Sequence, residues 1–430
     1  MTYKEIVTYI EEIPRFTRKH SLAHTREMLL FLGNPQNGKK IIHVAGTNGK
    51  GSVCAYLDAM LRAEGKSTGL FTSPHLVKMN ERIVLNGKQI SDEDFCEVFE
   101  ETMQAVRRMQ DAGLEHPTFF EFLFAMAMKA YDRAGMEYIV LETGLGGRLD
   151  ATSSVEPVAC VITSIGLDHM EYLGDTVEQI AGEKAGIIKP GVPVVIGETT
   201  EETKKVFKDK SLEMNAPIRF AEEEHEVISS RSEGNTRVYE TLHYGSFIGE
   251  LGGLCQEKNT ATILTAIDEL RKAGYTIAQE HIRIGFGQVC KLTGLRGRWQ
   301  QVGMSPTIIC DTGHNTGGIS YIADQLRGIQ ADKLHIVIGM VNDKDIHSVL
   351  RQLPQCATYY FTKANVKRAL DEHTLQTLAK EAGLRGTSWP DVRSAFQAAR
   401  QSSTKKDLIF VGGSTFIVAD FLAFYHPEQA

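Results

Sequence analysis

One segment near the N-terminus constrains the fold more than any other. The apolar run 41–45 breaks into Gly46-Thr47-Asn48-Gly49-Lys50-Gly51-Ser52, after which apolar residues recur at helical spacing up to Gly65. This order predicts a strand, a phosphate-binding loop and a helix, because glycines let successive backbone N–H groups face one anion and the helix N-terminus adds positive charge. Lys50 is placed to reach terminal phosphates, and Ser52 to contact a phosphate or its magnesium ion.

The spacing of this loop differs from the common nucleotide-binding pattern. Val44 stands where that pattern has its first glycine, and Gly51 follows the lysine in place of Ser or Thr. We interpret the loop as a shortened variant of the pattern. The alternative is a plain glycine-rich turn, which the combination of Lys50, Ser52 and the strand-to-helix context disfavours.

Length and charge narrow the class of protein. At 430 residues the chain exceeds what one hydrophobic core usually holds, which predicts two domains. The formal net charge of −7 gives no general attraction for nucleic acid or an anionic membrane, so neither is an expected partner. Seven cysteines without a C-x-x-C pair argue against a disulfide framework or a zinc site. With no export signal and no apolar run of ~18 residues, we expect a cytoplasmic protein with reduced thiols.

The first part of the chain has the sequence pattern of a layered α/β domain. From residue 40 to about 200, strand-like runs alternate with helical patterns and predict a doubly wound, mostly parallel sheet. The strand-like runs are 67–71, 138–141, 158–165 and 192–197. Between 218 and 251 short alternating segments around Gly234-Asn235 predict a small antiparallel appendage, and a helix is expected from about 256 to 272.

The second part of the chain shows the same alternation of strand-like and helical segments over fewer residues. After the glycine-rich, basic segment 293–298 the alternation restarts and predicts a Rossmann-like α/β domain. Its strand-like runs are 307–310, 335–338, 358–361 and 408–411. We therefore expect one domain over residues 1–293, which contains the phosphate loop, and a second over residues 294–430.

Polar residues follow several predicted strands of the first domain. Ligands of open α/β sheets lie beyond the carboxyl ends of the strands, which is where Ser73, Glu142 and Asp168-His169 occur. A nucleoside triphosphate on the loop brings magnesium, which prefers hard oxygen ligands, and Glu142 suits that role. Ser73 and His169 are equally well explained by residue type alone as hydrogen-bonding or capping residues.

Two other segments have both a chemical and a structural interpretation. Thr118-Phe119-Phe120-Glu121 offers aromatic surface and polar atoms that suit a flat heterocycle, but its phenylalanines also fit the buried face of a helix, and core packing is the favoured interpretation from the residues alone. Lys184, within a helical pattern, has the type and place of a solvated helix lysine.

The second domain offers an acidic and a basic candidate. Asp311 ends a predicted strand ahead of Thr312-Gly313-His314-Asn315, where a carboxylate suits a ribose hydroxyl or a catalytic cation, or caps a helix. Arg298 lies beside the expected hinge. A basic side chain supplied by one domain to phosphates on the other would complete a site only on closure.

Taken together, these motifs resemble the Mur-ligase-like amide ligases, and most closely the folylpolyglutamate synthase/dihydrofolate synthase family. The resemblance runs through nearly the whole chain. Besides the phosphate loop and residues 118–121, it rests on Thr72-Ser73-Pro74-His75-Leu76, residues 142–152, Leu167-Asp168-His169, residues 183–189, residues 311–315 and Asp343-Lys344-Asp345. Cys255 and Gly313 depart from it, because histidine and alanine are common in the family at these positions.

The resemblance implies an ATP-dependent ligase that joins the carboxylate of a folate or of dihydropteroate to L-glutamate through an acyl phosphate. It implies a P-loop ATP- and folate-binding domain followed by a glutamate ligase domain. The implied ATP-binding residues are Asn48, Gly49, Lys50, Gly51, Ser52, Asn259, Arg298, Asp311 and His314. The implied folate-binding residues are Thr118, Phe119, Phe120, Glu121, Leu149, Asp150 and Ala151.

The resemblance also implies two magnesium sites, with Ser73, Glu142, His169 and Lys184 as ligands. Lys184 is implied to be carbamylated, so that its amine becomes an anionic ligand, and Lys50, Lys184 and His169 are the implied catalytic residues. Two other functions compete with this interpretation. Residues 118–121 argue against a peptidoglycan-precursor ligase, and the implied second metal argues against a non-catalytic nucleotide-binding regulator. A monomer suits a hinged two-domain enzyme.

Overall fold

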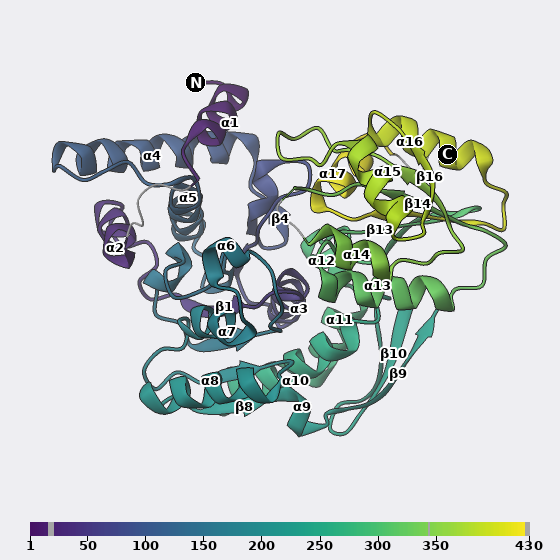
Figure 1. The fold of residues 1–430 in the computed structure, drawn as a ribbon. Helices are drawn as coiled ribbons and strands as arrows, with labels where there is room; N and C mark the ends of the chain where they lie inside the picture. Colours follow the sequence, from purple (N-terminus) through teal and green to yellow (C-terminus); the bar gives the residue numbers. More distant parts are fainter. Residues whose placement is uncertain (16–20, 343–344, 426–430) are drawn as a thin grey trace.

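The computed structural model describes residues 1–15, 21–342 and 345–425, which form two α/β lobes side by side (Figure 1). The N-terminal lobe contains an eight-stranded sheet in the order β4-β3-β2-β5-β1-β6-β7-β8. Its strands are β1 (Lys40–Ala45), β2 (Thr68–Phe71), β3 (Ile83–Leu85), β4 (Lys88–Gln89), β5 (Tyr138–Glu142), β6 (Ala159–Ile162), β7 (Val194–Ile196) and β8 (Ile218–Phe220).

Helices cover both faces of this sheet. The elements before residue 225 are α1 (Tyr3–Glu12), α2 (Leu22–Phe31), α3 (Lys50–Ala63), η1 (Met79–Arg82), α4 (Asp92–Asp111), α5 (Phe119–Arg133), η2 (Ala151–Ser154), α6 (Met170–Leu173), α7 (Val177–Ala185), α8 (Glu201–Glu213) and α9 (Ala221–Glu224). The helices α10 (Gln256–Lys272), α11 (Gln279–Gly287) and α12 (Val289–Thr293) follow a three-stranded antiparallel sheet of β9 (Val227–Glu233), β10 (Thr236–Thr241) and β11 (Gly245–Gly249).

The central strand β1 is buried on both faces, as expected for a strand inside a doubly wound sheet. Ile41 packs in one apolar cluster with helices α1, α2, α4 and α5, and Ala45 in another with α7 and α8. Ile42 and Val44 point to the opposite face, where they pack with α3, α10 and α11. This alternation of side chains along one strand fixes which face each helix covers.

Parallel pairing brings the carboxyl ends of four strands together. β1 pairs with β5 on one side and with β6 on the other, and β5 pairs with β2. Residues just after β1, β2, β5 and β6 therefore meet at one edge of the sheet. The doubly wound sheet and the antiparallel appendage predicted from the sequence are confirmed.

The C-terminal lobe contains a six-stranded sheet in the order β12-β13-β17-β14-β15-β16. Its strands are β12 (Gln300–Met304), β13 (Thr307–Asp311), β14 (Leu334–Ile338), β15 (Thr358–Phe361), β16 (Arg385–Ser388) and β17 (Leu408–Gly412). Its helices are α13 (Thr316–Gly328), α14 (Ile346–Gln352), α15 (Glu372–Glu381), α16 (Val392–Ser402) and α17 (Thr415–Phe424). All strand pairs are parallel except β12 with β13.

The lobes join where α12 ends. Gly294 has φ +73°, the left-handed conformation that commonly ends a helix, and β12 of the second sheet begins at Gln300. The division of the chain into domains 1–293 and 294–430 stays a prediction. Within the described parts of the chain, no helix is long and apolar enough to cross a bilayer. All seven cysteines are free.

Candidate functional site

The loop after β1 is held tightly against the end of β6. Gly46 has φ +148° and Gly49 has φ +86°, values that side-chain-bearing residues rarely adopt. A Cβ atom on Gly46 would overlap the Thr163 hydroxyl, so this position accepts only glycine. Thr47 N donates to Ser164 O at 2.8 Å, and Asn48 N donates to Ser164 Oγ at 3.1 Å. The loop is therefore shaped in advance of any ligand.

Two lysines converge on one carbonyl of this loop. Lys50, at the start of α3, donates from Nζ to Gly46 O at 3.0 Å and to Thr47 O at 3.2 Å. Lys184, from α7, donates to the same Gly46 O at 2.8 Å and is only 4% exposed. Burial, and then the positive charge of Lys50, lowers the pKa of Lys184 to about 7. The interpretation of Lys184 as a solvated helix lysine is therefore wrong.

Two of the residues implied as metal ligands touch one another. Glu142 ends β5, is 4% exposed, and accepts a hydrogen bond at Oε2 from Ser73 N at 2.9 Å. Burial raises the pKa of Glu142, and Lys50 opposes that shift. A Cβ atom on Gly51 would lie 3.9 Å from Glu142 Oε2, so the carboxylate faces the phosphate loop.

His169 approaches the same edge from the β6 side. It caps α6 with φ +52°, and its Nε2 lies 3.9 Å from Asp168 Oδ1. The donors offered by Ser73, Glu142 and His169 fit magnesium, which prefers oxygen ligands and retains water. Among the described residues, no three His, Cys, Asp or Glu side chains form a cluster that would hold a metal by themselves. Phosphate oxygens would complete such a site.

Arg298 and Asp311 reach the loop from the second lobe. A Cβ atom on Gly51 would lie 3.2 Å from Arg298 Nη2, and the same guanidinium donates to Thr312 Oγ1. The Asp311 carboxylate accepts from Trp299 N at 2.6 Å and from Gly313 N at 2.7 Å. Asp311 thus shapes the strand end that carries Arg298, rather than capping a helix.

Asn259 and His314 also border the loop. Asn259 Oδ1 occupies the space that a Cβ on Gly49 would need, and its Nδ2 donates to Gln256 Oε1 at 3.0 Å. Gln256 in turn donates to Ser52 Oγ at 3.4 Å. His314 donates from Nδ1 to Thr312 O at 2.9 Å, and the side chains of Asn259 and Arg298 lie against glycines of the loop.

Sequence reasoning passed over one residue at this convergence. Asn315 exchanges two hydrogen bonds of 3.0 Å with the Asn48 side chain and donates to Asp168 Oδ2 at 2.9 Å. His314 Nε2 lies 3.6 Å from the same carboxylate oxygen. Asn315 belonged to a recognised motif, but its partners lie far away in the sequence, so no local pattern could single it out.

Residues 118–121 begin α5 beside this edge. Thr118 and Glu121 form a capping box, in which Glu121 Oε2 accepts from Thr118 N at 2.9 Å and from Thr118 Oγ1 at 2.8 Å. Its Oε1 accepts from Thr25 Oγ1 at 2.9 Å. Burial alone would raise the pKa of Glu121, but hydrogen bonds from His24 and Thr118 outweigh it and hold the pKa at about 2. Glu121 is thus a cap with its oxygens engaged.

The two phenylalanines differ in their surroundings. Phe120 packs over Gly144, where a Cβ would overlap its ring, and lies 5.7 Å from the Phe71 ring. Phe119 contacts two guanidinium groups, those of Arg15 at 5.3 Å and Arg82 at 5.4 Å from the ring centroid. Cation–π contacts of this kind place positive charge around the buried Phe119 ring at the start of α5. The contacts of Arg15 and Arg82 with Phe119 join residues that are far apart in the sequence, so the sequence analysis did not identify either arginine.

Leu149, Asp150 and Ala151 differ in orientation. Leu149 is 38% exposed, whereas Asp150 and Ala151 are buried. Asp150 Oδ2 accepts from Gly144 N at 2.9 Å and Leu145 N at 2.8 Å, and Oδ1 accepts from Thr152 N at 3.1 Å. The Asp150 carboxylate thus holds the loop after β5 in its shape.

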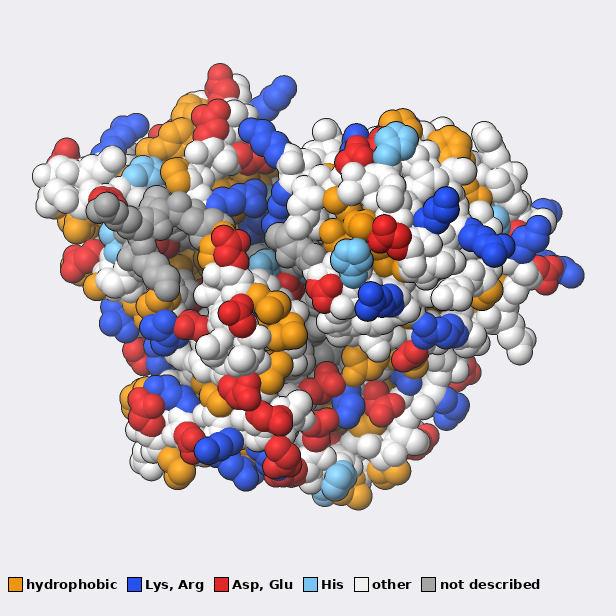
Figure 2. All heavy atoms as spheres, in the orientation of Figure 1, with side chains coloured by type: hydrophobic (Ala, Val, Ile, Leu, Met, Phe, Trp, Pro, Cys, Tyr) orange, Lys and Arg blue, Asp and Glu red, His pale blue; other side chains and the backbone are white. Residues whose placement is uncertain are grey.

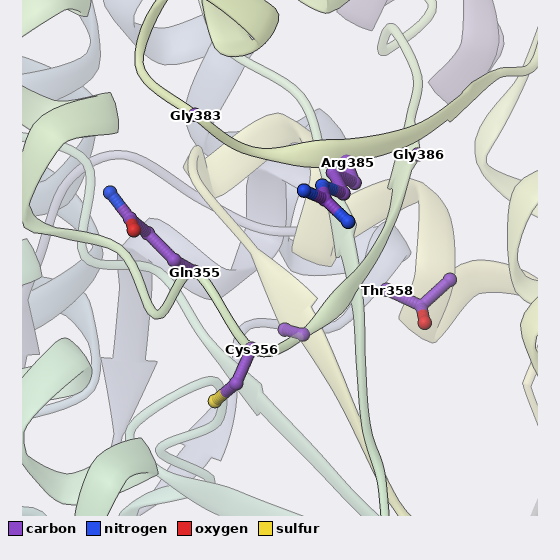
Figure 3. Close-up of a pocket in the computed structure, with 7 residues that line it drawn as sticks. Gln355, Cys356, Thr358, Gly383, Arg385 and Gly386 are labelled. Carbon is purple, nitrogen blue, oxygen red and sulfur yellow. The ribbon is translucent and has the colours of Figure 1, made fainter.

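The surface around the loop is mixed in character. Figure 2 shows Lys and Arg side chains gathering where the two lobes meet, beside hydrophobic side chains. A separate hollow of about 470 Å³ lies between Gln355, Cys356, Thr358 and Arg385 (Figure 3). This hollow lies where β15 and β16 begin, whereas the phosphate loop faces the carboxyl ends of the strands. It therefore lies at the opposite edge of the sheet and is not part of the phosphate-loop site.

The fold and the loop define a class of protein. Residues 44–250 match the sequence profile of the Mur ligase middle domain, and residues 297–415 match that of the Mur ligase glutamate ligase domain, which makes the chain a Mur-type ligase. The dihydrofolate synthase/folylpolyglutamate synthase of Bacillus subtilis (strain 168) is 30% identical over 427 residues, covering 97% of this chain and 98% of that protein. The chain belongs to the dihydrofolate synthase/folylpolyglutamate synthase family.

Other relatives agree with this assignment. The probable bifunctional folylpolyglutamate synthase/dihydropteroate synthase of Haloferax volcanii is 32% identical over 434 residues, but the 98% of this chain that aligns spans only 50% of that protein. The structure of E. coli FolC in complex with DHPP and ADP has a TM-score of 0.86 at 29% identity, covering 100% of this chain and 99% of that one. A bifunctional folylpolyglutamate synthase/dihydrofolate synthase with Mn, AMPPNP and L-glutamate bound has a TM-score of 0.82 at 29% identity, with 98% of each chain covered. The predicted family and fold class are confirmed. Asp343 and Lys344 of the last family motif lie outside the described residues.

Proposed function

We propose that this protein is an ATP-dependent ligase that joins the carboxylate of dihydropteroate or a folate to the amino group of L-glutamate. The observation that carries the proposal is the meeting of a phosphate loop, a buried Glu142 and an Arg298 from the second lobe at one strand edge. Relatives that are named dihydrofolate synthase/folylpolyglutamate synthase, and relatives solved with ADP or with AMPPNP and L-glutamate, support the choice of substrates.

The reaction needs a carboxylate oxygen to become a leaving group. The backbone N–H groups of residues 49–52 hold the ATP phosphates, and Lys50 leaves the Gly46 carbonyl to spread the charge that develops on the γ-phosphate. The substrate carboxylate attacks that phosphate, ADP leaves, and an acyl phosphate remains. The amine of L-glutamate then displaces phosphate and forms the amide. Asn259 contributes to ATP binding from α10 of the first lobe, and Arg298, Asp311 and His314 contribute from the second lobe.

Magnesium, when bound, neutralises phosphate charge at this site. Ser73, Glu142 and His169 would hold one ion, and Lys184 would serve a second. The Lys184 pKa of about 7 leaves much of the amine neutral at pH 7, and a neutral amine can attack carbon dioxide. The amine nitrogen forms a bond to the carbon of carbon dioxide, one C=O π bond opens to an oxyanion and the nitrogen loses one proton, so the neutral amine becomes an anionic oxygen ligand.

The folate subsite in this proposal lies between the start of α5 and the loop after β5. Phe119, Phe120, Leu149 and Ala151 supply its apolar wall. Thr118, Glu121 and Asp150 line it mainly as shaping residues, because their polar atoms are engaged in the capping box and the β5 loop. Arg15 and Arg82 give this wall an attraction for the carboxylate end of the substrate.

A substrate-dependence assay tests the function. We expect magnesium-dependent ATP hydrolysis that requires L-glutamate together with dihydropteroate or tetrahydrofolate, and mass spectrometry should find the new amide. Chelation of the metal should abolish turnover. Hydrolysis with a muropeptide precursor in place of the folates would favour the peptidoglycan branch, and nucleotide binding without any hydrolysis would contradict a ligase.

A second assay tests the carbamate. Lys184→Ala should lose at least about 100-fold in kcat, since removing an essential charge-stabilising group typically costs this much. Added bicarbonate should not restore the variant, whereas a short carboxylic acid should do so in part. Lys205→Ala, on an exposed face of α8, is the matched control and should keep full turnover. Normal activity of Lys184→Ala would contradict the carbamate proposal.

A further inference from the structure

A contact between the two lobes has no part in the function proposed above. Asn315 precedes α13, is 5% exposed and lies against the phosphate loop. Its Nδ2 donates to Asn48 Oδ1 at 3.0 Å and to Asp168 Oδ2 at 2.9 Å. Its Oδ1 accepts from Asn48 Nδ2 at 3.0 Å and from Gly318 N at 2.9 Å. Both N–H groups and both lone pairs of this amide are therefore used.

The partners also fix the orientation of the amide. A backbone N–H can only donate, so Asn315 Oδ1 must face Gly318, and an ionised carboxylate can only accept, so Nδ2 must face Asp168. These assignments also orient the Asn48 amide, because its Nδ2 must donate to Asn315 Oδ1 and its Oδ1 must accept from Asn315 Nδ2. Aspartate at position 315 would lack the two donors, and serine would offer one hydroxyl. Asparagine alone satisfies every partner at this size.

The two partners on the N-terminal lobe belong to its chemical centre. Asn48 lies within the phosphate loop, between Gly46 and Gly49, whose positive φ angles shape it. Asp168 Oδ1 accepts from His169 N at 2.9 Å, and its charge acts to raise the pKa of Lys184. The α13 terminus is packed closely here, because a Cβ on Gly317 would lie 3.2 Å from Asn48 Nδ2.

Among the other polar contacts between the lobes, His314 Nε2 lies 3.6 Å from the same Asp168 Oδ2, and Gln325 accepts from Leu254 N at 2.9 Å and donates to Gly252 O at 3.0 Å. Arg296 pairs with Glu81 at 2.8 Å, and Tyr321 OH donates to Glu198 at 3.1 Å. These pairs are partly exposed and are worth little individually. The Asn315 amide, by contrast, is buried and makes four bonds at once. It is therefore the contact that fixes how the second lobe sits on the phosphate loop.

We propose that Asn315 is a positioning residue that sets the register between the two lobes. The proposal rests on the function above, in which the acyl phosphate forms on the N-terminal lobe and the C-terminal lobe delivers the amine of L-glutamate. Asn315 touches no reacting atom and acts through Asn48 and Asp168. Its loss lets the lobes drift, and a displacement of about 1 Å is enough to slow a reaction by about 100-fold.

The first test uses Asn315→Asp, which keeps the oxygen that caps α13. It removes both N–H donors and sets a second carboxylate against Asp168. We expect kcat to fall about 10- to 100-fold, the usual effect of losing hydrogen bonds to charged groups. The KM for ATP should change by a smaller factor than kcat, because the phosphate loop itself is intact and only contacts from the second lobe, such as that of Arg298, are displaced. Asn37→Asp makes the same chemical change at an exposed turn and should leave turnover unchanged.

A rescue separates positioning from a general loss of structure. Adding Asp168→Asn to Asn315→Asp exchanges the donor and the acceptor of this one hydrogen bond, so hydrogen exchange of the amides of 315–318 in the ligand-free double variant should return toward the rate of the unaltered protein. Asn315→Ser keeps a capping oxygen without adding charge, and its kcat should also fall. Normal kcat in Asn315→Asp, or amides of 315–318 that exchange as fast in the double variant as in the single one, would overturn the proposal.

A third measurement needs no substrate and so distinguishes this proposal from the proposed function. Hydrogen exchange of the ligand-free enzyme should show the amides of 46–50 and 315–318 exchanging about tenfold faster in Asn315→Asp than in the unaltered protein. Equal exchange would contradict the contact. Absence of glutamate-dependent ATP hydrolysis in the unaltered protein would instead contradict the proposed function and leave the exchange result standing.

Discussion

At the residue scale, the space beside Gly46 is the tightest in the site. Its φ of +148° and the overlap of any Cβ with the Thr163 hydroxyl leave no room for alanine. We expect Gly46→Ala to weaken nucleotide binding at least tenfold and to destabilise the fold by about 2 kcal/mol. Titration calorimetry and thermal melts measure both. The control is Gly182→Ala, on exposed α7 with open space around it, which should be neutral or slightly stabilising. Unchanged binding by Gly46→Ala would show that the loop relaxes.

Lys184 makes stability depend on pH. The unfolded chain keeps this amine protonated up to about pH 10.4, whereas the folded protein releases the proton near pH 7, so stability rises with pH between these values. Lys184→Met removes the cost of burying the charge. We expect it to gain stability of the order of 1–3 kcal/mol at pH 7 in buffer free of carbon dioxide, with a smaller gain at pH 10.

Denaturant titrations at the two pH values measure this gain. Lys205→Met, at an exposed position, serves as the control and should show no such difference. A Lys184→Met variant that is less stable than the unaltered protein at pH 7 would contradict this prediction. It would mean that the hydrogen bond from the Lys184 amine to Gly46 O stabilises the fold by more than burial of the amine destabilises it.

Site residues were predictable from the sequence where a side chain suited to phosphate or metal binding also stands in a recognisable strand or loop pattern. Glu142 ends one apolar run and Lys50 lies in the glycine-rich loop that follows another, and the structure brings both to one edge of the sheet. Lys184 was placed in the site only by family resemblance, because helical periodicity says nothing about which face a distant loop covers. The contacts of Arg82 and of Asn315, the latter within a recognised motif, were not predictable, since their partners are separated from them by long stretches of chain.

At the scale of elements, α3 carries a buried charge two turns after the phosphate loop. Asp58 is fully buried, and neither carboxylate oxygen makes a well-formed hydrogen bond to a described residue. Burial raises the pKa of Asp58 to about 6, against the opposing influence of Thr68 and Arg62. The folded protein thus holds a proton that the unfolded chain releases near pH 4, and stability falls as the pH rises from about 4 to about 6.

Asp58→Asn should remove that cost. We expect the variant to be more stable than the unaltered protein by about 1–2 kcal/mol at pH 8, where the carboxylate is charged, and equally stable at pH 4. Melting temperatures at both pH values measure the difference, and Asp209→Asn on exposed α8 is the control. A loss of stability at pH 8 would mean that the Asp58 carboxylate has a compensating partner.

Sequence predicted the elements with long apolar runs and missed the short ones at sheet edges. β5 and β17 are buried along their whole length, and their apolar runs mark them clearly. β16 is Arg385-Gly386-Thr387-Ser388, without an apolar run, and β12 contains Gly303 at an irregularity of the ladder. These edge strands form because a neighbouring strand accepts and donates their backbone hydrogen bonds. That neighbour is brought close by the tertiary fold, so the local sequence does not predict it.

At the scale of the whole molecule, the apolar cores are separate. The clusters that contain Phe410 and Val411 consist of buried residues from 299 to 425, with Leu76 as the one partly buried residue contributed by the other lobe. The clusters of the N-terminal lobe contain no buried residue beyond 289. Polar contacts, such as those of Asn315, therefore join two bodies that could each bury their own apolar surface.

This separation predicts that residues 294–430 fold without the rest of the chain. A fragment of this length with its own six-stranded sheet and helices on both faces should unfold in one cooperative thermal transition. Its circular dichroism should be that of an α/β protein, and it should bind no ATP, because the phosphate loop is absent. A fragment beginning at residue 312 lacks β12 and β13 and is the negative control. A fragment 294–430 without a cooperative transition would contradict the boundary and would mean that contacts such as Leu76 complete the second core.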